Sequence, residues 1–225
     1  MNEAEEITPL TIEQTIQQRI MDGLDAMDVS YGEEAIANLV EYLDLLQEWN
    51  KTHNLTAVDD VDQMLSIHIF DSVSIKPYMK GPTLLDVGSG AGLPGMIWAI
   101  LSPAFEVVSI EAKGKKAQFQ KFVANKLQLK NFTVENVRVE EYDPAEKFSM
   151  VTARAFSSLT EFVELSKNAI ASNGRWLAMK GVMPEEELKE LSKVKNIKFD
   201  TYALKVPELD AQRNLVVIEP KNSKK

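Results

Sequence analysis

The chain has 225 residues, a net charge of −9, 44% hydrophobic residues and no cysteine. This composition is typical of a globular protein with one sizeable core. It excludes disulfides, cysteine-ligated metal centres and cysteine nucleophiles. No apolar run approaches the ~18 residues that predict a membrane span, and the acidic N-terminus lacks the basic and apolar regions of a secretory signal. We therefore expect a cytoplasmic protein without a membrane partner.

The negative charge is concentrated at the N-terminus. Residues 1–40 carry nine acids and one arginine, which leaves 24 basic and 25 acidic residues for residues 41–225. Residues 113–130 contain six lysines and no acid. A lysine run by itself is most simply a solvated helix face, but this distribution leaves room for a nucleic-acid partner.

The first 80 residues show helical periodicity. The segment Ser30-Tyr31-Gly32-Glu33 predicts a capping box, followed by an apolar stripe at helical spacing. A second helix is predicted from Val61 to Ile75, with its N-cap at Asp59 or Asp60. We expect residues 1–80 to form a helical extension packed on the core.

From residue 81 onward, short strands alternate with helices. This alternation predicts an α/β fold, a doubly wound and mainly parallel seven-stranded sheet of the Rossmann-like kind. The last two strands have no crossover helix between them, so they should form an antiparallel hairpin at the sheet edge. We assign residues 81–225 to this domain, with strands at 83–87, 106–110, 132–135, 150–153, 175–179, 198–203 and 214–218.

A glycine-rich turn follows the first of these strands. Asp86 is followed by glycines at alternate positions, Gly88, Gly90 and Gly92, with Ser89 and Leu93 in the same turn. Glycines let a ligand approach the backbone, and we expect the main-chain amides of residues 88–93 to be open to it.

Two cofactor classes use such a turn. Residues 90–95 match the dinucleotide fingerprint, but the match begins two residues beyond Gly88 rather than at the strand end. A carboxylate at Asp86 would repel a pyrophosphate, whereas it would tolerate a ligand that carries an ammonium and a sulfonium. S-adenosylmethionine is therefore favoured over NAD(P). Glu111 ends the second strand, where nucleotide-binding folds place an acid on the ribose, and the loop with Val139 and Glu140 should cradle the adenine.

The residues that the sequence lacks limit the classes of methyl acceptor. Pyrimidine C5 transfer needs a cysteine, and exocyclic amine transfer typically uses an Asp/Asn-Pro-Pro-aromatic element that is missing from residues 153–158. A purine N7 has a free lone pair and needs no general base. Many small-molecule methyltransferases are equally poor in acid–base residues, so that class stays open.

Several motifs together resemble one family. They are residues 49–56 (WNKTHNLT), 68–72 (HIFDS), 86–95 (DVGSGAGLPG), 154–156 (RAF) and 177–181 (LAMKG). On these motifs the chain resembles the bacterial small-subunit rRNA guanine-N7 methyltransferases, the RsmG (GidB) family, over roughly residues 40–218. The resemblance implies methyl transfer to N7 of a guanine in the 530 loop of 16S rRNA, as free RNA or within the small ribosomal subunit.

The resemblance also implies roles for single residues. Gly88, Leu93, Val139, Glu140 and Arg154 match positions of cofactor contacts. Arg154 and Lys180 are the candidate catalytic residues, with Arg154 also facing the target base. The candidate substrate contacts are Asn54, His68, Lys116 and Arg213. From the residues alone, His68 is more simply a core histidine that pins Asp71, and Asn54 a turn cap.

The chain departs from the family pattern at Ile67, Lys115-Lys116 and Asn214, where relatives often carry Arg, Lys-Arg and His. These departures concern RNA contacts more than chemistry. Three alternative functions remain: a small-molecule methyltransferase, an NAD(P) oxidoreductase, and a catalytically silent RNA-binding module. We expect a monomer without a metal ion.

Overall fold

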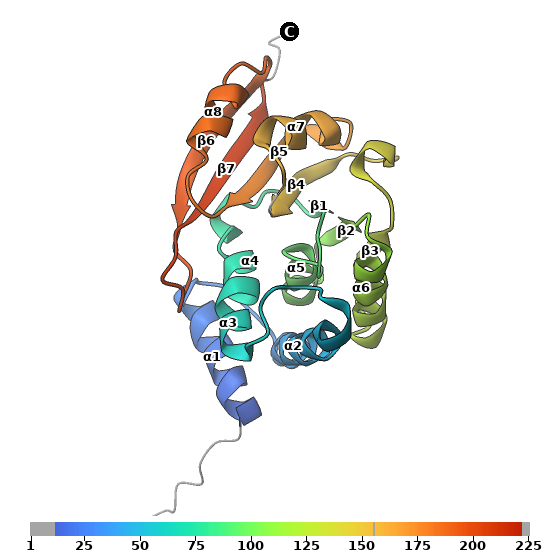
Figure 1. Cartoon of the computed structure of the whole chain (residues 1–225), viewed down its shortest axis with the longest axis vertical. Helices are drawn as coiled ribbons and strands as arrows, with labels where there is room; N and C mark the ends of the chain where they lie inside the picture. The colour runs from blue at the N-terminus through green and yellow to red at the C-terminus, as the bar shows by residue number, and fades with distance from the viewer. Residues whose placement is uncertain (1–11, 155, 222–225) are drawn as a thin grey trace, which may run out of the picture.

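A computed structural model describes residues 12–154 and 156–221, and it contains one seven-stranded sheet in the order β3-β2-β1-β4-β5-β7-β6 (Figure 1). Strands β1 to β5 pair in parallel, whereas β7 pairs antiparallel with both β5 and β6. The predicted fold class and edge hairpin are confirmed. The strands are β1 Thr83–Val87, β2 Glu106–Ile110, β3 Phe132–Glu135, β4 Phe148–Arg154, β5 Ile170–Lys180, β6 Ile197–Leu204 and β7 Arg213–Pro220.

The largest difference from the predicted strands lies in β5, which begins at Ile170 rather than Arg175. Its first half contains exposed Ser172 and Asn173, which resemble a turn in the sequence. In the structure Ile170 pairs with Phe148 at the start of β4, and Ser172 and Asn173 lie in the register irregularity that follows, before pairing resumes at Arg175. The turn-like residues therefore form a bulge within one longer strand.

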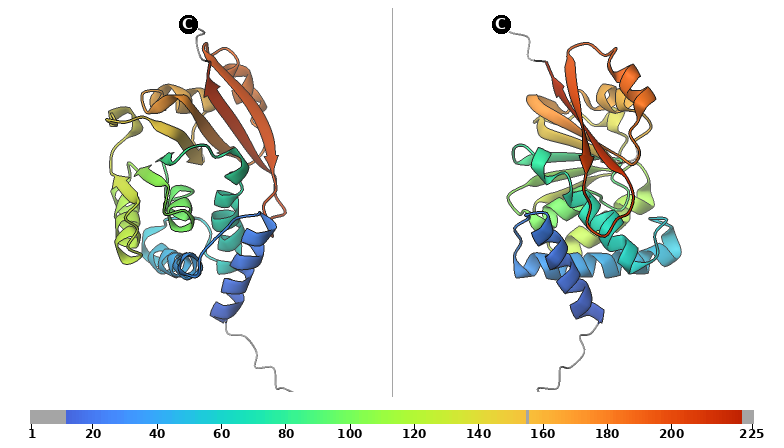
Figure 2. Two further views of the ribbon diagram at one scale, coloured as in Figure 1. Left: turned by 180° about the vertical axis from the view of Figure 1, so that it is seen from behind. Right: turned by 90° about the vertical axis from the view of Figure 1, so that its left-hand side faces the viewer.

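Helices cover both faces of the sheet. In Figure 1, α7 and α8 lie above the sheet and α2 and α5 lie below it, and the side view in Figure 2 shows the same two layers. The helices are α1 Ile12–Ala26, α2 Glu33–His53, α3 Val61–Met64, α4 Asp71–Val73, α5 Gly95–Leu101, α6 Gly114–Lys126, α7 Leu159–Ser166 and α8 Glu185–Leu191.

Two hydrophobic clusters fill these layers, because successive strand residues point to opposite faces. Leu84 packs with α1, α2, α5 and α6 in one cluster, whereas its neighbour Leu85 packs with α7 in the other. Ile20 and Leu39, from the first 80 residues, belong to the first cluster. The helical extension is therefore packed against the sheet through a shared core.

The predicted capping box is wrong. Gly32 is the N-cap of α2, and no side chain caps that end. The helix begins at Glu33, so this glutamate is the first helical residue, whereas a capping box needs it at the third helical position. The apolar stripe of α2 is confirmed, since Ile36, Leu39 and Leu43 are all buried.

The predicted helix over 61–75 is one helical segment with a π-helical turn, Leu65–Phe70, between α3 and α4. Asp60 caps its start by accepting a hydrogen bond from the Gln63 amide. At the wide turn, the Asp71 amide donates to the carbonyls of Ser66 and His68 rather than to that of Ile67. The Ile67 carbonyl instead accepts a hydrogen bond from a side chain in the candidate site.

Candidate functional site at the carboxyl edge of the sheet

Two cavities lie at the carboxyl ends of the parallel strands, where doubly wound folds bind their ligands. The first, which we call the turn cavity, has a volume of about 200 Å³ and lies over β1, β2 and β3. The second, the arginine cavity, has a volume of about 320 Å³ and lies over β4, β5 and β7. The sheet order reverses between β1 and β4, so the cavities occupy the two sides of this switch point.

The turn cavity has mixed apolar and polar walls. Val137, Val139 and Leu165 provide apolar surface, and Glu140 lines the same cavity with its carboxylate. The predicted residues Gly88, Val139 and Glu140 are thus brought together. Phe156, which sequence reasoning missed, lies in the segment after β4 and also lines the cavity.

Gly88 is the residue of the turn that leaves room for a ligand. Its φ is +67°, a conformation that favours glycine, and a Cβ built on it would meet no atom within 4 Å. Gly92 also has a positive φ of +91°, but a Cβ there would approach Cβ of Met96 at 3.0 Å. Gly88 therefore opens space to a ligand, whereas Gly92 permits close packing of the turn.

The expectation of open amides is wrong for most of the turn. The amides of Gly88 and Ser89 donate to the Ile110 carbonyl, and those of Gly92 and Leu93 donate to the Ser89 carbonyl. The Gly90 amide donates to Glu111 Oε2 at 2.8 Å. These hydrogen bonds hold the turn in one conformation. The surface that it presents to a ligand is the backbone of its glycines, without side chains.

A buried network of side chains lies beneath the turn. Ser89 Oγ and Ser109 Oγ lie 2.5 Å apart, and Gln120 Oε1 accepts a hydrogen bond from Ser109. Gln120 Nε2 donates to Ser89 Oγ and to the Gly90 carbonyl, at 2.7 and 2.8 Å. All three side chains belong to buried residues. The network joins the turn to β2 and α6, and sequence reasoning found Ser89 but not its partners.

Glu111 and Lys116 border the turn. Each Glu111 carboxylate oxygen accepts one amide, from Gly90 or from Lys113 at 2.7 Å, and a carboxylate oxygen has a second lone pair for a ligand hydroxyl. Lys116 Nζ lies 3.8 Å from the position of a Cβ on Gly90. Lys116, a predicted substrate contact, therefore lies over the glycine turn.

Asp86, on β1, is fully buried, and its carboxylate contacts the start of α5. Its Oδ2 accepts the Gly95 amide at 2.8 Å, while Oδ1 has no hydrogen-bond partner among the described residues. Burial raises the pKa of the Asp86 carboxyl to about 7, against the lowering effects of the Gly95 amide and Arg154. The hydrogen bond from Gly95 to Asp86 therefore joins β1 to the start of α5 beneath the turn. Leu93, another predicted residue of the turn, is also buried.

In the arginine cavity two guanidinium groups share one carboxylate. Arg154 Nη1 donates to the Ile67 carbonyl at 2.8 Å and lies 3.4 Å from Asp71 Oδ2. Arg213 Nε donates to Asp71 Oδ1 at 3.1 Å. Burial raises the pKa of the Asp71 carboxyl, and both arginines oppose that rise. The predicted Arg154 and Arg213 are brought together by Asp71, which was not among the predicted site residues.

Lys180 borders the same cavity, but its amino group is held by other parts of the chain. Lys180 Nζ donates to Glu187 Oε2 on α8 at 2.9 Å and to the Phe156 carbonyl at 3.2 Å. Glu187 also accepts the Leu159 amide at the start of α7. Lys180 therefore fixes the segment that follows β4.

His68 and Asn54 lie outside the two sets of cavity residues. His68 is buried and its Nε2 lies 3.1 Å from Thr56 Oγ1. The predicted pairing of His68 with Asp71 is wrong, because the arginines occupy that carboxylate. Burial lowers the pKa of the His68 imidazole to about 4. Asn54 is the left-handed C-cap of α2, with φ of 48°, which confirms its cap role.

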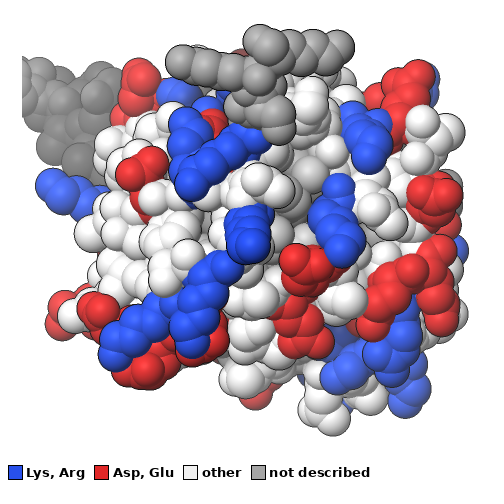
Figure 3. Space-filling view, turned by 90° about the horizontal axis from the view of Figure 1, so that it is seen from above, with Lys and Arg blue, Asp and Glu red and all other residues white. Residues whose placement is uncertain are grey.

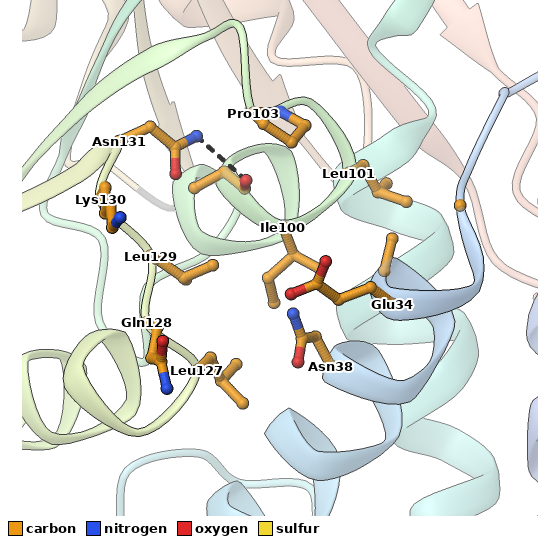
Figure 4. A pocket seen from close by; sticks show the side chains of 13 residues that line it. Glu34, Asn38, Ile100, Leu101, Pro103, Leu127, Gln128, Leu129, Lys130 and Asn131 are labelled. Atoms are coloured by element: carbon orange, nitrogen blue, oxygen red, sulfur yellow. Dashed lines mark hydrogen bonds between the residues drawn. The ribbon is translucent and has the colours of Figure 1, made fainter.

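A further cavity lies away from this edge of the sheet. A cavity of about 350 Å³ lies at the opposite, amino-terminal edge of β2 and β3, between α2, α5 and α6 (Figure 4). Within residues 12–154 and 156–221, no cluster of three acidic or histidine side chains could hold a metal ion. No helix in the described part of the chain is long and apolar enough to cross a bilayer.

Charged side chains are unevenly spread. Figure 3 shows Lys and Arg side chains in a diagonal band on the face seen from above, bordered by acidic side chains. The net charge of −9 therefore coexists with locally basic surface.

Solved structures share this fold. A SAM-dependent methyltransferase from Aquifex aeolicus matches with a TM-score of 0.54 at 19% identity, over 73% of this chain and 96% of that chain. The M1A22 tRNA methyltransferase from Bacillus subtilis matches with a TM-score of 0.57 at 15% identity, over 69% of this chain and 67% of that chain. These matches show that the chain has the Rossmann-like fold of these structures.

Sequence comparison identifies the family. The model for rRNA small subunit methyltransferase G (GidB) matches residues 35–216. The ribosomal RNA small subunit methyltransferase G of Methylobacillus flagellatus is 44% identical over 90% of this chain and 98% of its own length. That of Laribacter hongkongensis is 40% identical, over 89% and 97%. The chain belongs to the rRNA small subunit methyltransferase G family.

Proposed function

We propose that the protein transfers a methyl group from S-adenosylmethionine to N7 of a guanine in the 530 loop of 16S rRNA. The observation that carries this proposal is the pair of cavities on either side of the switch point, one shaped by glycine and the other lined by two arginines. Family membership supplies the rRNA substrate class.

The turn cavity fits the adenosyl group of the cofactor. A Cβ on Gly88 would fill space that is open here, and the apolar walls suit an adenine ring. Glu111 retains acceptor capacity for ribose hydroxyls, and Lys116 would pair with the carboxylate of the methionine part. S-adenosylmethionine supplies the activated methyl group, and the protein aligns it with the acceptor.

The arginine cavity fits an acceptor that has no proton to lose. Asp71 is engaged by Arg154 and Arg213, and the imidazole of His68 is turned to Thr56. Neither group is placed as a general base, and a guanine N7 needs none. Arg154 presents a fixed positive charge to the base, and Arg213 adds positive charge near the flanking phosphates. Lys180 acts indirectly, by holding the segment that follows β4 through Glu187 and the Phe156 carbonyl.

We further propose that residues 1–80 and 81–225 work as one unit, because the extension supplies Ile67 and Asp71 to the arginine cavity. The protein would act as a monomer in the cytoplasm, where ribosomal subunits are assembled, and without a metal ion.

The test is methyl transfer from radiolabelled S-adenosylmethionine to 30S subunits, or to free 16S rRNA, that lack the modification. We expect label at a guanine of the 530 loop, detected by strand cleavage at N7-methylguanine. Arg154→Ala should reduce turnover at least tenfold with the fold retained, although the unfolding temperature should fall because Asp71 loses one of its two partners. Label at another atom would contradict the N7 assignment. Absence of label from both RNA substrates would reject the proposal and favour a small-molecule acceptor.

A further inference from the structure

An aromatic cluster reaches the surface along the seam between α2 and α6. The Trp49 ring centroid lies 5.5 Å from that of buried Phe119, 5.3 Å from that of Phe122 and 4.9 Å from that of His53. Phe122 is 42% exposed and Trp49 is partly exposed. The cluster therefore begins in the core and ends as an aromatic surface in solvent.

Exposure of this kind is uncommon in the molecule. Among the residues that the structure describes, the only exposed large hydrophobic side chains are Phe122, Val182 and Tyr202. Tyr202 stacks against Tyr78 with ring centroids 4.4 Å apart. A contiguous exposed apolar patch that is rimmed by polar groups is typical of a binding site, and Phe122, Trp49 and His53 form a contiguous aromatic patch.

Lysines line the α6 side of this cluster. Lys115, Phe122 and Lys126 follow the i, i+7, i+11 spacing of one helix stripe, which extends over about 16 Å. Lys126 pairs with Glu41 at 3.6 Å. Lys115 and the neighbouring Lys121 form no ion pair with any residue in the described ranges. The aromatic surface is thus flanked by cations that are available to an anion.

The stripe starts beside the candidate active site. Lys116, the neighbour of Lys115, reaches over Gly90 of the turn. The α2 side of the seam carries the acids Glu41 and Glu48, both exposed or nearly so. A polyanion that leaves the active site would therefore follow α6 rather than α2.

We infer that this seam is a second RNA-binding surface, which takes a single-stranded segment of the substrate rRNA outside the target nucleotide. A base stacks on Phe122 beside Trp49, and Lys115 and Lys121 neutralise the neighbouring phosphates. Single-stranded RNA is read in this way because an unstacked base offers its face to an aromatic ring. The inference rests on the proposed rRNA substrate.

The test uses the full chain and a fluorescently labelled single-stranded RNA with the sequence of the 530 loop. Phe122→Ala should weaken RNA binding about tenfold, the size expected for one lost stacking contact. It should leave the affinity for S-adenosylhomocysteine unchanged. Tyr202→Ala is the matched control, since it removes a similarly exposed ring from β6, and it should bind RNA as the parent does.

Two further readouts distinguish stacking from a structural effect. Trp98 and Trp176 are buried, so quenching of tryptophan emission by RNA should come from Trp49 and should be lost in Phe122→Ala. The Lys115→Ala/Lys121→Ala double variant should reduce the slope of log affinity against log salt by about 1.4, or ~0.7 for each lost phosphate contact.

The outcomes separate this inference from the proposed function. If the parent methylates rRNA but the Phe122 and lysine variants match it in RNA affinity, quenching and salt slope, the seam is not an RNA surface and the proposed function stands. If the parent neither binds nor methylates rRNA, both are overturned.

Discussion

Asp71 holds the two arginines of the arginine cavity, Arg154 and Arg213. Its carboxylate is almost fully buried, and it accepts from Arg213 while lying within ion-pair distance of Arg154. A buried charge that loses its partner is costly, and so is the reverse case of two like charges left without a carboxylate. Asp71 therefore sets both the stability and the geometry of this cavity.

Asp71→Asn should lower turnover about tenfold or more while leaving the affinity for S-adenosylhomocysteine within twofold of the parent, because the turn cavity is not touched. The unfolding temperature should fall by several degrees, since a loss of about 3 kcal/mol is typical when one partner of a buried ion pair is removed. Kinetics, calorimetry and thermal unfolding check these points. The control is Asp62→Asn, an exposed partner of Arg19. Equal turnover in the parent and in Asp71→Asn would show that the arginines do not need this carboxylate.

Asp86 makes the stability of the protein depend on pH. Burial raises its pKa in the folded state to about 7, and Arg154 and Glu111 are the charged groups that also act on it. The unfolded chain releases this proton near pH 4, whereas the folded chain retains it up to about pH 7. The contribution of Asp86 is therefore full below pH 4 and is lost as the pH rises to 7.

Asp86→Asn removes this titration and keeps an oxygen for the Gly95 amide. The free energy of unfolding of the parent, minus that of the variant, should fall by roughly 1.4 kcal/mol per pH unit between about pH 4 and pH 7. Denaturant unfolding at pH 5, 6 and 7 measures it. A difference that stays constant over this range would show that Asp86 is ionised throughout.

At the scale of elements, the glycine turn is held by side chains from β2 and α6 rather than by a ligand. Gln120 on α6 bonds Ser89, Ser109 and the Gly90 carbonyl at once. A buried network whose members are all bonded stiffens the backbone it contacts. We therefore attribute the shape of the glycine turn to Gln120.

Gln120→Leu keeps the volume but leaves both serines and the Gly90 carbonyl without this partner. We expect the dissociation constant for S-adenosylhomocysteine to rise about tenfold, since unsatisfied buried polar groups cost about 1–3 kcal/mol. Gln118→Leu, an exposed position on the same helix, should bind as the parent does. Calorimetric titration of both variants decides the matter. Identical affinities would mean that the turn keeps its shape without the network.

Elements with strong local patterns could be predicted from the sequence. Strands β1, β2 and β3 have the predicted bounds, because each is a short apolar run between turn residues. The capping box failed since Gly32 gave the helix an uncapped start at Glu33. The π-helical turn could not be predicted, because its widening depends on a partner, Arg154, that lies 87 residues away from Ile67 in the sequence.

The candidate site was predicted in the same uneven way. Gly88 follows β1, and Val139 and Glu140 follow β3, so their meeting at the carboxyl edge of a sheet of known topology was predictable. The pairing of Asp71 with Arg154 and Arg213 joins residues 83 and 142 positions apart, and no periodicity reports such contacts. The open amides were wrong because the sequence could not show that the turn closes on Ile110 and Glu111.

At the scale of the whole molecule, the helical extension is built into the enzyme. Arg19 on α1 forms ion pairs with Asp62, at the start of the second helical segment, and with Glu208 in the loop before β7. The same segment supplies the Ile67 carbonyl and Asp71 to the arginine cavity. The extension thus connects the acidic N-terminal region to the wall of the arginine cavity.

Under the proposed function, the arrangement separates two tasks across one sheet edge, with the cofactor over β1 to β3 and the RNA base over β4, β5 and β7. Its central requirement is that the open space over Gly88 receives the adenosyl group. A methyl group added there, in Gly88→Ala, would occupy that space and would also strain a positive φ by about 1 kcal/mol. Gly32→Ala is the control, since a Cβ on Gly32 also meets no atom within 4 Å, and its φ is −104°.

Calorimetric titration of S-adenosylhomocysteine into the parent, Gly88→Ala and Gly32→Ala tests this requirement directly. We predict one binding site per chain for the parent and for Gly32→Ala, and at least tenfold weaker binding for Gly88→Ala with its fold retained. No heat of binding with the folded parent protein, or unchanged affinity in Gly88→Ala, would contradict it.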